Sequence, residues 1–181
     1  MTKNNWYVIT GGPSVGKTSL LSELAKLGYD IVPEAARTVI DEGLEGGLNL
    51  EAIRSDEKSF QEKVAIRKQH IEAARDPRHL TFFDRGMQDT VAYMQYYNFD
   101  INPEIEKLMK ASTYKKVFLL EPLATYKADY ARTEGKAFMK EVHDLLLTAY
   151  TNAGMNPILV PAAGLKERLK IILGEINSTA Q

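Results

Sequence analysis

The segment GGPSVGKT at residues 11–18 has the residue types and spacing of a phosphate-binding loop. Glycines at its first and sixth positions let the backbone bend so that successive amides can face one anion. Lys17 would place a charge on the β- and γ-phosphates, and the Thr18 hydroxyl could ligate Mg²⁺. We therefore expect ATP, or alternatively GTP, with Mg²⁺. The expected cofactor-binding residues are Gly11, Gly12, Pro13, Ser14, Val15, Gly16, Lys17, Thr18 and Ser19.

A second group of charged residues follows an apolar run in HLTFFDRG, residues 79–86. Ligands of parallel sheets bind at the carboxyl ends of the strands, so Asp84 should lie beside the loop and hold Mg²⁺ through its water shell. Its alternative role is to cap the following helix. Arg85 stands where motor-type ATPases commonly carry a glutamate. Its guanidinium favours a grip on a phosphate or an acceptor, with a structural ion pair as the alternative.

Further candidates lie in IVPEAAR and in a charged segment near residue 130. Glu34 could act as general base on an acceptor hydroxyl, sit near magnesium, or simply favour the first turn of a helix. Arg37 could pair with Glu34 or hold an acceptor. The segment at about 121–137 is expected to form a lid in which Arg132 stabilises the transferred phosphoryl group, with a solvated loop as the alternative.

Short apolar runs alternate with helical patterns along the chain, which predicts an α/β fold with a parallel sheet covered on both faces. The expected strands are Trp6–Thr10, Tyr29–Val32, Leu80–Phe83, Lys116–Leu120 and Ile158–Val160. The expected helices are 18–27, 34–42, 56–75 with Ser55 as cap, 87–97, 103–112, 138–152 and 165–176. The glycine-dense segment Gly43–Leu50 is expected to be a mobile loop.

Composition narrows the classes of protein. A chain of 181 residues fits one domain, 1–181. The absence of cysteine excludes disulfides and thiolate chemistry, and a net charge of −1 argues against a general nucleic-acid binder. No apolar run approaches the roughly 20 residues of a membrane span. We therefore expect a cytoplasmic protein without integral membrane association.

The motifs together resemble the NadR-like AAA domain group of P-loop proteins, which neighbours the nucleoside and nucleotide kinases. The matching pieces are GGPSVGKTSL, IVPEAAR, FFDRGMQDTVAY, FLLEPLATYKADYARTE and ILVPAAGLKERLKIIL. The resemblance implies a three-layer P-loop NTPase fold, a five-stranded parallel sheet of order 2-3-1-4-5, a kinase-like arginine lid, and ATP or GTP with Mg²⁺. It carries functional roles onto Lys17, Thr18, Glu34, Arg37, Asp84, Arg85, Asp89 and Arg132, with Asp89 on the substrate side. ATYKADYAR departs from the group, whose members tend to have a proline and a glycine before the arginine.

Three functions compete on these grounds. The first is a Mg-ATP-dependent phosphotransferase acting on a small hydroxyl-bearing acceptor such as a nucleoside or nucleotide. The second is a nucleotide-binding regulatory module that recruits a protein or a phosphoinositide head group. The third is a polynucleotide end kinase, against which the net charge of −1 weighs. The acceptor, the base preference and the oligomeric state stay open.

Overall fold

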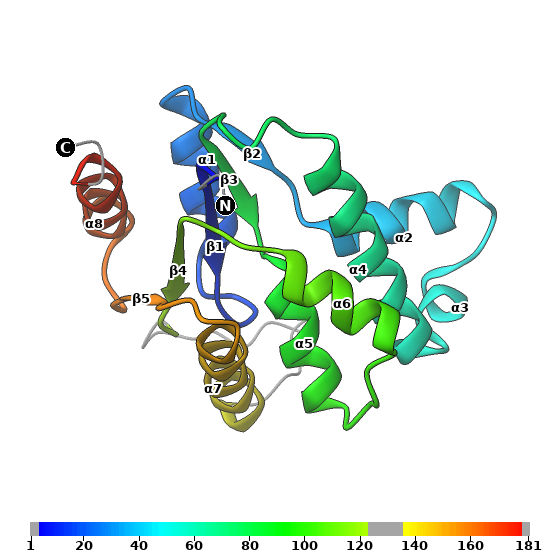
Figure 1. Cartoon of the computed structure of the whole chain (residues 1–181). Coiled ribbons are helices and arrows are strands. Elements are labelled where there is room, and N and C mark those ends of the chain that lie inside the picture. The colour runs from blue at the N-terminus through cyan, green and yellow to red at the C-terminus, as the bar shows by residue number, and fades with distance from the viewer. Residues whose placement is uncertain (1–3, 123–135, 179–181) are drawn as a thin grey trace.

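A computed structural model describes residues 4–122 and 136–178. Five parallel strands form one sheet of order β2-β3-β1-β4-β5 (Figure 1), which confirms the predicted topology. The strands are β1 (Trp6–Thr10), β2 (Asp30–Val32), β3 (Thr81–Asp84), β4 (Lys116–Leu120) and β5 (Ile158–Val160). Because all five run the same way, their carboxyl ends meet at one edge of the sheet, where Thr10 and Asp84 end their strands.

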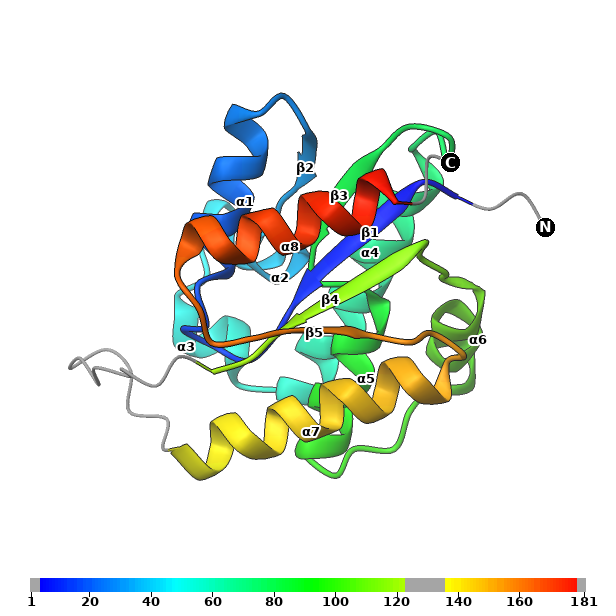
Figure 2. The ribbon, with the colours of Figure 1, turned by 90° about the vertical axis from the view of Figure 1, so that its left-hand side faces the viewer.

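Helices cover both faces of the sheet, as Figures 1 and 2 show. They are α1 (Lys17–Lys26), α2 (Ala35–Glu45), α3 (Leu50–Arg54), α4 (Glu57–Ala73), α5 (Met87–Tyr96), α6 (Pro103–Ala111), α7 (Lys136–Asn152) and α8 (Leu165–Asn177). Side chains alternate along β1, so that Tyr7 and Ile9 pack with α1 and α8, and Trp6 and Val8 pack with α5 and α7. The result is a three-layer sandwich with two apolar interfaces. In the ranges described, no helix is both long and apolar enough to cross a membrane.

The region between β2 and α4 differs from the sequence-based expectation. Gly43 lies inside α2, and α3 begins at Leu50, so the predicted loop Gly43–Leu50 is wrong at both ends. A Cβ on Gly43 would lie 2.7 Å from Ile53 Cδ1, so this glycine lets α3 pack closely on α2 instead of marking a turn. The cap of α4 is Asp56, whose side chain accepts from the Ser59 amide at 3.0 Å, and Ser55 instead donates to the Ala52 carbonyl.

Candidate active site

The loop between β1 and α1 has the backbone that its glycines predict. Gly11 has φ +143° and Gly16 has φ +92°, both in the region that side chains disfavour. A Cβ on Gly11 would lie 2.9 Å from both the Leu120 carbonyl oxygen and Val15 Cγ2, so the loop packs against the end of β4 without room for a side chain. No side chain caps the first amides of α1. These amides are therefore free to bind an anion.

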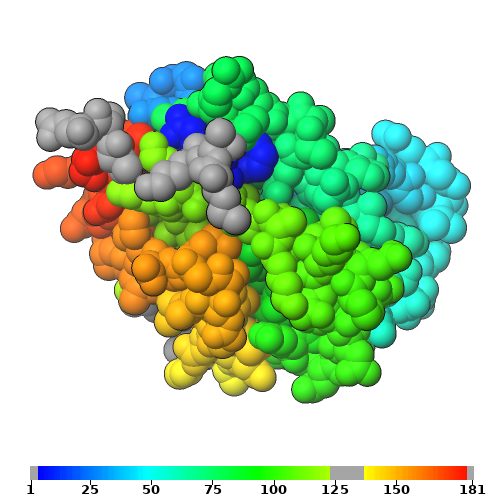
Figure 3. Space-filling view, viewed as in Figure 1, coloured from blue at the N-terminus to red at the C-terminus, as the bar shows by residue number. Residues whose placement is uncertain are grey.

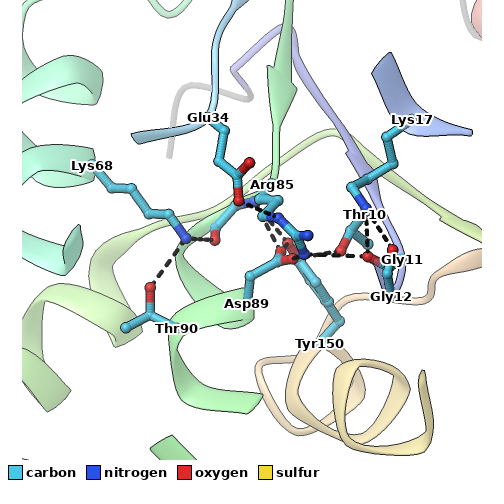
Figure 4. A network of polar contacts seen from close by, with 11 residues as sticks. Thr10, Gly11, Gly12, Lys17, Glu34, Lys68, Arg85, Asp89, Thr90 and Tyr150 are labelled. Carbon is cyan, nitrogen blue, oxygen red and sulfur yellow. Dashed lines mark hydrogen bonds and ion pairs between the residues drawn. The ribbon is translucent and has the colours of Figure 1, made fainter. Parts of the chain in front are cut away.

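Lys17 lies against this loop. Its side chain is nearly buried, and Nζ donates to the carbonyl oxygens of Gly11 at 2.9 Å and Gly12 at 2.6 Å (Figure 4). Burial lowers the pKa of the Lys17 ammonium to about 7, and the nearby Arg85 charge acts in the same direction. A polyphosphate beside the amine would favour its charged form.

Asp84 ends β3 next to Ile9 of β1, at the edge from which the loop starts. The helix after it is capped at Gly86, so the alternative of Asp84 as a helix cap does not hold. Its Oδ1 atom is buried and has no hydrogen-bond partner, and burial raises the pKa of the carboxyl group. A buried carboxylate oxygen without a partner is rare, and an ion or its water shell would satisfy it.

Arg85 connects the loop to the second strand. Its Nε donates to Glu34 at 2.7 Å, and Nη1 lies 3.2 Å from both Asp89 Oδ1 and the Gly11 carbonyl oxygen (Figure 4). Glu34 is the cap residue of α2, but its carboxylate makes no cap bond and is directed at Arg85 instead. The structural ion pair is thus present. The same pair also lines a pocket, described below.

The carboxylate of Asp89 is buried, and both of its oxygen atoms accept hydrogen bonds from other groups of the protein. Oδ1 accepts from Thr10 Oγ1 at 2.6 Å and from Arg85, and Oδ2 accepts from the Tyr150 hydroxyl at 2.6 Å and the Gly86 amide at 3.0 Å. A carboxylate has about four lone-pair sites, so these bonds saturate it. Asp89 is therefore placed to fix its neighbours rather than to offer an oxygen to a substrate.

Lys68 belongs to this network, although no motif in the sequence points to it. It lies on α4, which reads as a polar, solvated helix, yet its side chain is nearly buried. Nζ donates to the Gly86 carbonyl oxygen at 2.5 Å and to Thr90 Oγ1 at 3.0 Å. Tyr150 and Thr10 are likewise unforeseen members.

A pocket of about 160 Å³ opens beside the Glu34–Arg85 pair. Its lining combines aromatic rings with polar groups: Phe60, Tyr93, Tyr97 and Phe138 with Glu34, Arg54, Gln61, Lys68, Arg85 and Asp89. The guanidinium of Arg85 lies 5.6 Å from the Tyr93 ring centroid, and that of Arg54 lies 4.5 Å from the Phe60 ring. The pocket can therefore hold an apolar or aromatic ring near charged groups. Arg37 is exposed on α2 and is not among the lining residues.

A larger hollow of about 400 Å³ lies between α2, α3 and α4. This part of the chain, cyan in Figures 1 and 3, forms one side of the molecule. The hollow shares Phe60 with the smaller pocket but lacks Glu34, Arg85 and Asp89, which line the smaller one. We place the site at the smaller pocket because the charged groups are there. Arg132, with most of the predicted lid at 121–137, lies outside the described residues.

The rings of Tyr150 and Tyr114 pack so closely on Gly86 that we expect a side chain at this position to destabilise the fold. A Cβ at this position would lie 2.6 Å from the Tyr150 hydroxyl and 2.7 Å from Tyr114 Cε2. Both rings are rigid and buried, so Gly86→Ala should lower the free energy of unfolding by about 1–3 kcal/mol. Urea unfolding of the wild type and the variant would measure this difference in free energy. Gly174→Ala, where a Cβ meets nothing within 4 Å, is the control and should be neutral or stabilising. Equal stability of the two variants would contradict the packing described here.

The comparisons with known proteins agree with this geometry. Residues 6–168 match the sequence model of an AAA domain family. The chain belongs to this AAA domain family. The match contains every described residue of the site, from the loop to Tyr150. Comparison of this AAA domain with curated proteins found no match.

Solved structures similar to this AAA domain include nucleotide and nucleoside kinases and NadR. Thymidylate kinase from Candida albicans matches with a TM-score of 0.70 and 13% identity, covering 98% of this chain and 93% of its own. Deoxyadenosine kinase from M. mycoides matches with a TM-score of 0.61 and 18% identity, covering 96% of this chain and 99% of its own. NadR, in complex with NAD and AMP-PNP, matches with a TM-score of 0.71 and 15% identity, covering 98% of this chain and 50% of NadR. At these identities the likeness establishes the P-loop kinase fold, and the chain spans about half of NadR.

Proposed function

We propose that this AAA domain is a Mg-ATP-dependent phosphotransferase whose acceptor is a small hydroxyl-bearing molecule with a ring, such as a nucleoside or nucleotide. One observation carries the proposal. Arg85 lines the aromatic pocket and also donates to the Gly11 carbonyl, so an acceptor pocket and a phosphate-binding loop are joined by one side chain. The names of the similar structures, thymidylate kinase and deoxyadenosine kinase, point to the same acceptor class. GTP is the alternative donor.

The residues present fit a nucleotide with magnesium. The glycine backbone packs too closely for side chains at Gly11, the helix start carries uncapped amides, and Asp84 holds an unpartnered buried oxygen. Lys17 and the amides of residues 11, 12 and 14–18 would hold the phosphates, and Thr18 and Asp84 would hold Mg²⁺. When bound, ATP supplies the phosphoryl group and Mg²⁺ neutralises its charge. The described residues contain no group of three or more His, Asp or Glu that could hold a metal without phosphate.

In this proposal the side chains of the pocket have separate roles. Glu34 uses Oε1 for Arg85, which leaves its second oxygen to accept the proton of an acceptor hydroxyl as general base. Arg85 holds the acceptor or its phosphate at the end of the pocket next to the loop. We assign the aromatic rings to the acceptor's ring. Arg37 and Arg132 remain candidates for acceptor and phosphoryl contacts.

A transfer assay tests the proposal. Purified protein with Mg²⁺ and either ATP or GTP should first show a thermal shift, because a ligand at about 100 times its Kd adds about 2.7 kcal/mol. The donor that binds should then pass its γ-phosphate to a member of a panel of nucleosides, nucleotides and other hydroxyl metabolites. Arg85→Lys should lower kcat for transfer by about 10²-fold while the nucleotide Kd stays unchanged. Arg78→Lys is the control, because that arginine is exposed and pairs only locally with Asp76. Absence of transfer to every acceptor would refute the phosphotransferase.

A regulatory module that binds a nucleotide and recruits a partner is the second candidate. The observation in its favour is a set of exposed leucines on and between α2 and α3, namely Leu44, Leu48 and Leu50. Exposed apolar patches often mark interaction surfaces. Nucleotide binding without transfer to any acceptor, together with partner affinity that depends on the nucleotide, would favour this function.

A further inference from the structure

The turn between β3 and α5 has an unusual conformation at the residue that joins pocket and loop. Arg85 has φ +71°, in the left-handed region that a long side chain rarely adopts. Such a conformation costs about 1–3 kcal/mol and persists only where the surroundings enforce it. The groups that hold this turn therefore decide where the guanidinium of Arg85 lies.

The peptide groups of Gly86, which follow Arg85, are held from two sides. The Gly86 amide is directed at Asp89 Oδ2 and the Tyr150 hydroxyl, both at 3.0 Å. Its carbonyl oxygen accepts from Lys68 Nζ at 2.5 Å. The first contacts come from α5 and α7, whereas the last comes from Lys68 on α4 (Figure 4).

Burying the Lys68 ammonium has a cost that its surroundings must offset. A buried charge is tolerated when it is hydrogen-bonded and balanced by an opposite charge. Burial lowers the pKa of Lys68, and this effect is opposed by the buried Asp89 carboxylate. The ammonium also has two acceptors, Gly86 O and Thr90 Oγ1. Lys68 and Arg85 together match the charges of Asp89 and Glu34. If Arg85 shifts part of its interaction to an anionic ligand, Lys68 still balances Asp89.

We propose that Lys68 is a positioning residue: by holding the Gly86 carbonyl it keeps the turn in its left-handed conformation and fixes the Arg85 guanidinium against Glu34. The effect on catalysis rests on the proposed function, because only a reaction makes the placement of Arg85 matter to a rate. The effect on Arg85 itself does not rest on it. A displacement of about 1 Å at such a group can cost about 10²-fold in rate.

The variants separate this role from general stability. Lys68→Met keeps most of the stem and removes the charge and the donor, while Lys68→Arg keeps both. Lys68→Gln is a second replacement that stays polar but is shorter, should the methionine variant not fold. Lys63→Met is the matched control, because Lys63 is exposed on the same helix and lines the other hollow.

The first measurement is the Nε–H NMR signal of Arg85 in protein without substrate, assigned with Arg85→Lys. Its bond to Glu34 should make this proton slow to exchange. We expect folded Lys68→Met or Lys68→Gln to lose the slow exchange, Lys68→Arg to restore it in large part, and Lys63→Met to leave it unchanged. An unchanged Arg85 signal in a folded Lys68 variant would overturn the proposal. This result stands whether or not the protein transfers phosphate.

The second measurement is the rate of transfer. Lys68→Met should lower kcat by about 10–10²-fold and leave the nucleotide Kd unchanged, with recovery in Lys68→Arg. A loss of nucleotide affinity equal to the loss in rate, with the Arg85 signal intact, would show a general structural role and contradict the proposal. If the wild-type protein transfers no phosphate, the proposed function fails, and the NMR result alone decides the role of Lys68.

Discussion

Lys17→Met is expected to lower kcat/KM for phosphoryl transfer by about 10³-fold. The ammonium lies on the carbonyls of Gly11 and Gly12, at the place where successive amides can meet phosphate oxygens. Its charge is needed most where the equatorial oxygens of the transferred group gain negative charge. Methionine keeps the buried aliphatic stem, so the fold should survive. Initial rates over a range of nucleotide and acceptor concentrations measure the effect, with circular dichroism as the check on folding.

Lys26→Met is the matched control for this variant. Lys26 is on the same helix, is exposed, and pairs with Glu23 one turn earlier. Its replacement should leave the rate unchanged. A folded Lys17→Met protein that retains the wild-type rate of transfer would show that the loop takes no part in the reaction, whatever the acceptor is.

Asp89→Asn is expected to lower the free energy of unfolding at pH 7 by about 3–5 kcal/mol. The change leaves the buried Lys68 and Arg85 without their shared counter-charge. It also replaces one carboxylate oxygen with an NH₂ group, which then faces either Thr10 Oγ1 and Arg85 or the Tyr150 hydroxyl and the Gly86 amide, groups that donate in the wild-type protein. Urea unfolding measures the loss. Asp41→Asn, at an exposed position on α2, is the control and should change little.

The loss of stability in Asp89→Asn is expected to depend on pH. Burial raises the pKa of Asp89, but the charges of Lys68 and Arg85, together with the hydrogen bonds from Thr10 and Tyr150, outweigh it, so the net pKa lies below its ordinary value. A lowered carboxyl pKa stabilises the fold above the unfolded value of about 3.9, and this contribution is lost as the pH falls through the folded pKa. The stability difference between wild type and Asp89→Asn should therefore narrow below about pH 4. A difference that stays constant from pH 7 into that range would contradict a charge-based role.

Much of the fold could be predicted because its signals are local. Five short apolar runs gave the strands, and the glycine spacing before Lys17 placed the loop between a strand and a helix. The order of the strands came from the resemblance and is confirmed. The segment around Gly43 was misread because glycine density is typical of loops, whereas Gly43 sits inside α2 for the sake of contact with Ile53. Close approach between two helices leaves no mark in the sequence of either one.

The candidate site could be predicted from local signals only at the loop motif and at strand ends, and Asp89 came from the resemblance. Asp84 ends β3, Arg85 follows it, and Glu34 comes two residues after β2. The edge of a parallel sheet brings these residues together. Lys68 reaches the same place from within α4, and Tyr150 reaches it from the last turn of α7. A lysine on a polar helix looks solvated, and a tyrosine on an apolar face looks like core, until the tertiary structure places Gly86 and Asp89 between them.

The amides of the Gly11–Thr18 loop are the centre of this account, and an NMR titration of ¹⁵N-labelled protein with Mg-ATP tests them most directly. We expect saturable shifts concentrated in the amides of residues 11, 12 and 14–18 and near Asp84, with far smaller shifts in Lys17→Met at the same concentrations. Binding that leaves those amides unmoved, or no saturable shift with either ATP or GTP at millimolar concentration, would contradict the account.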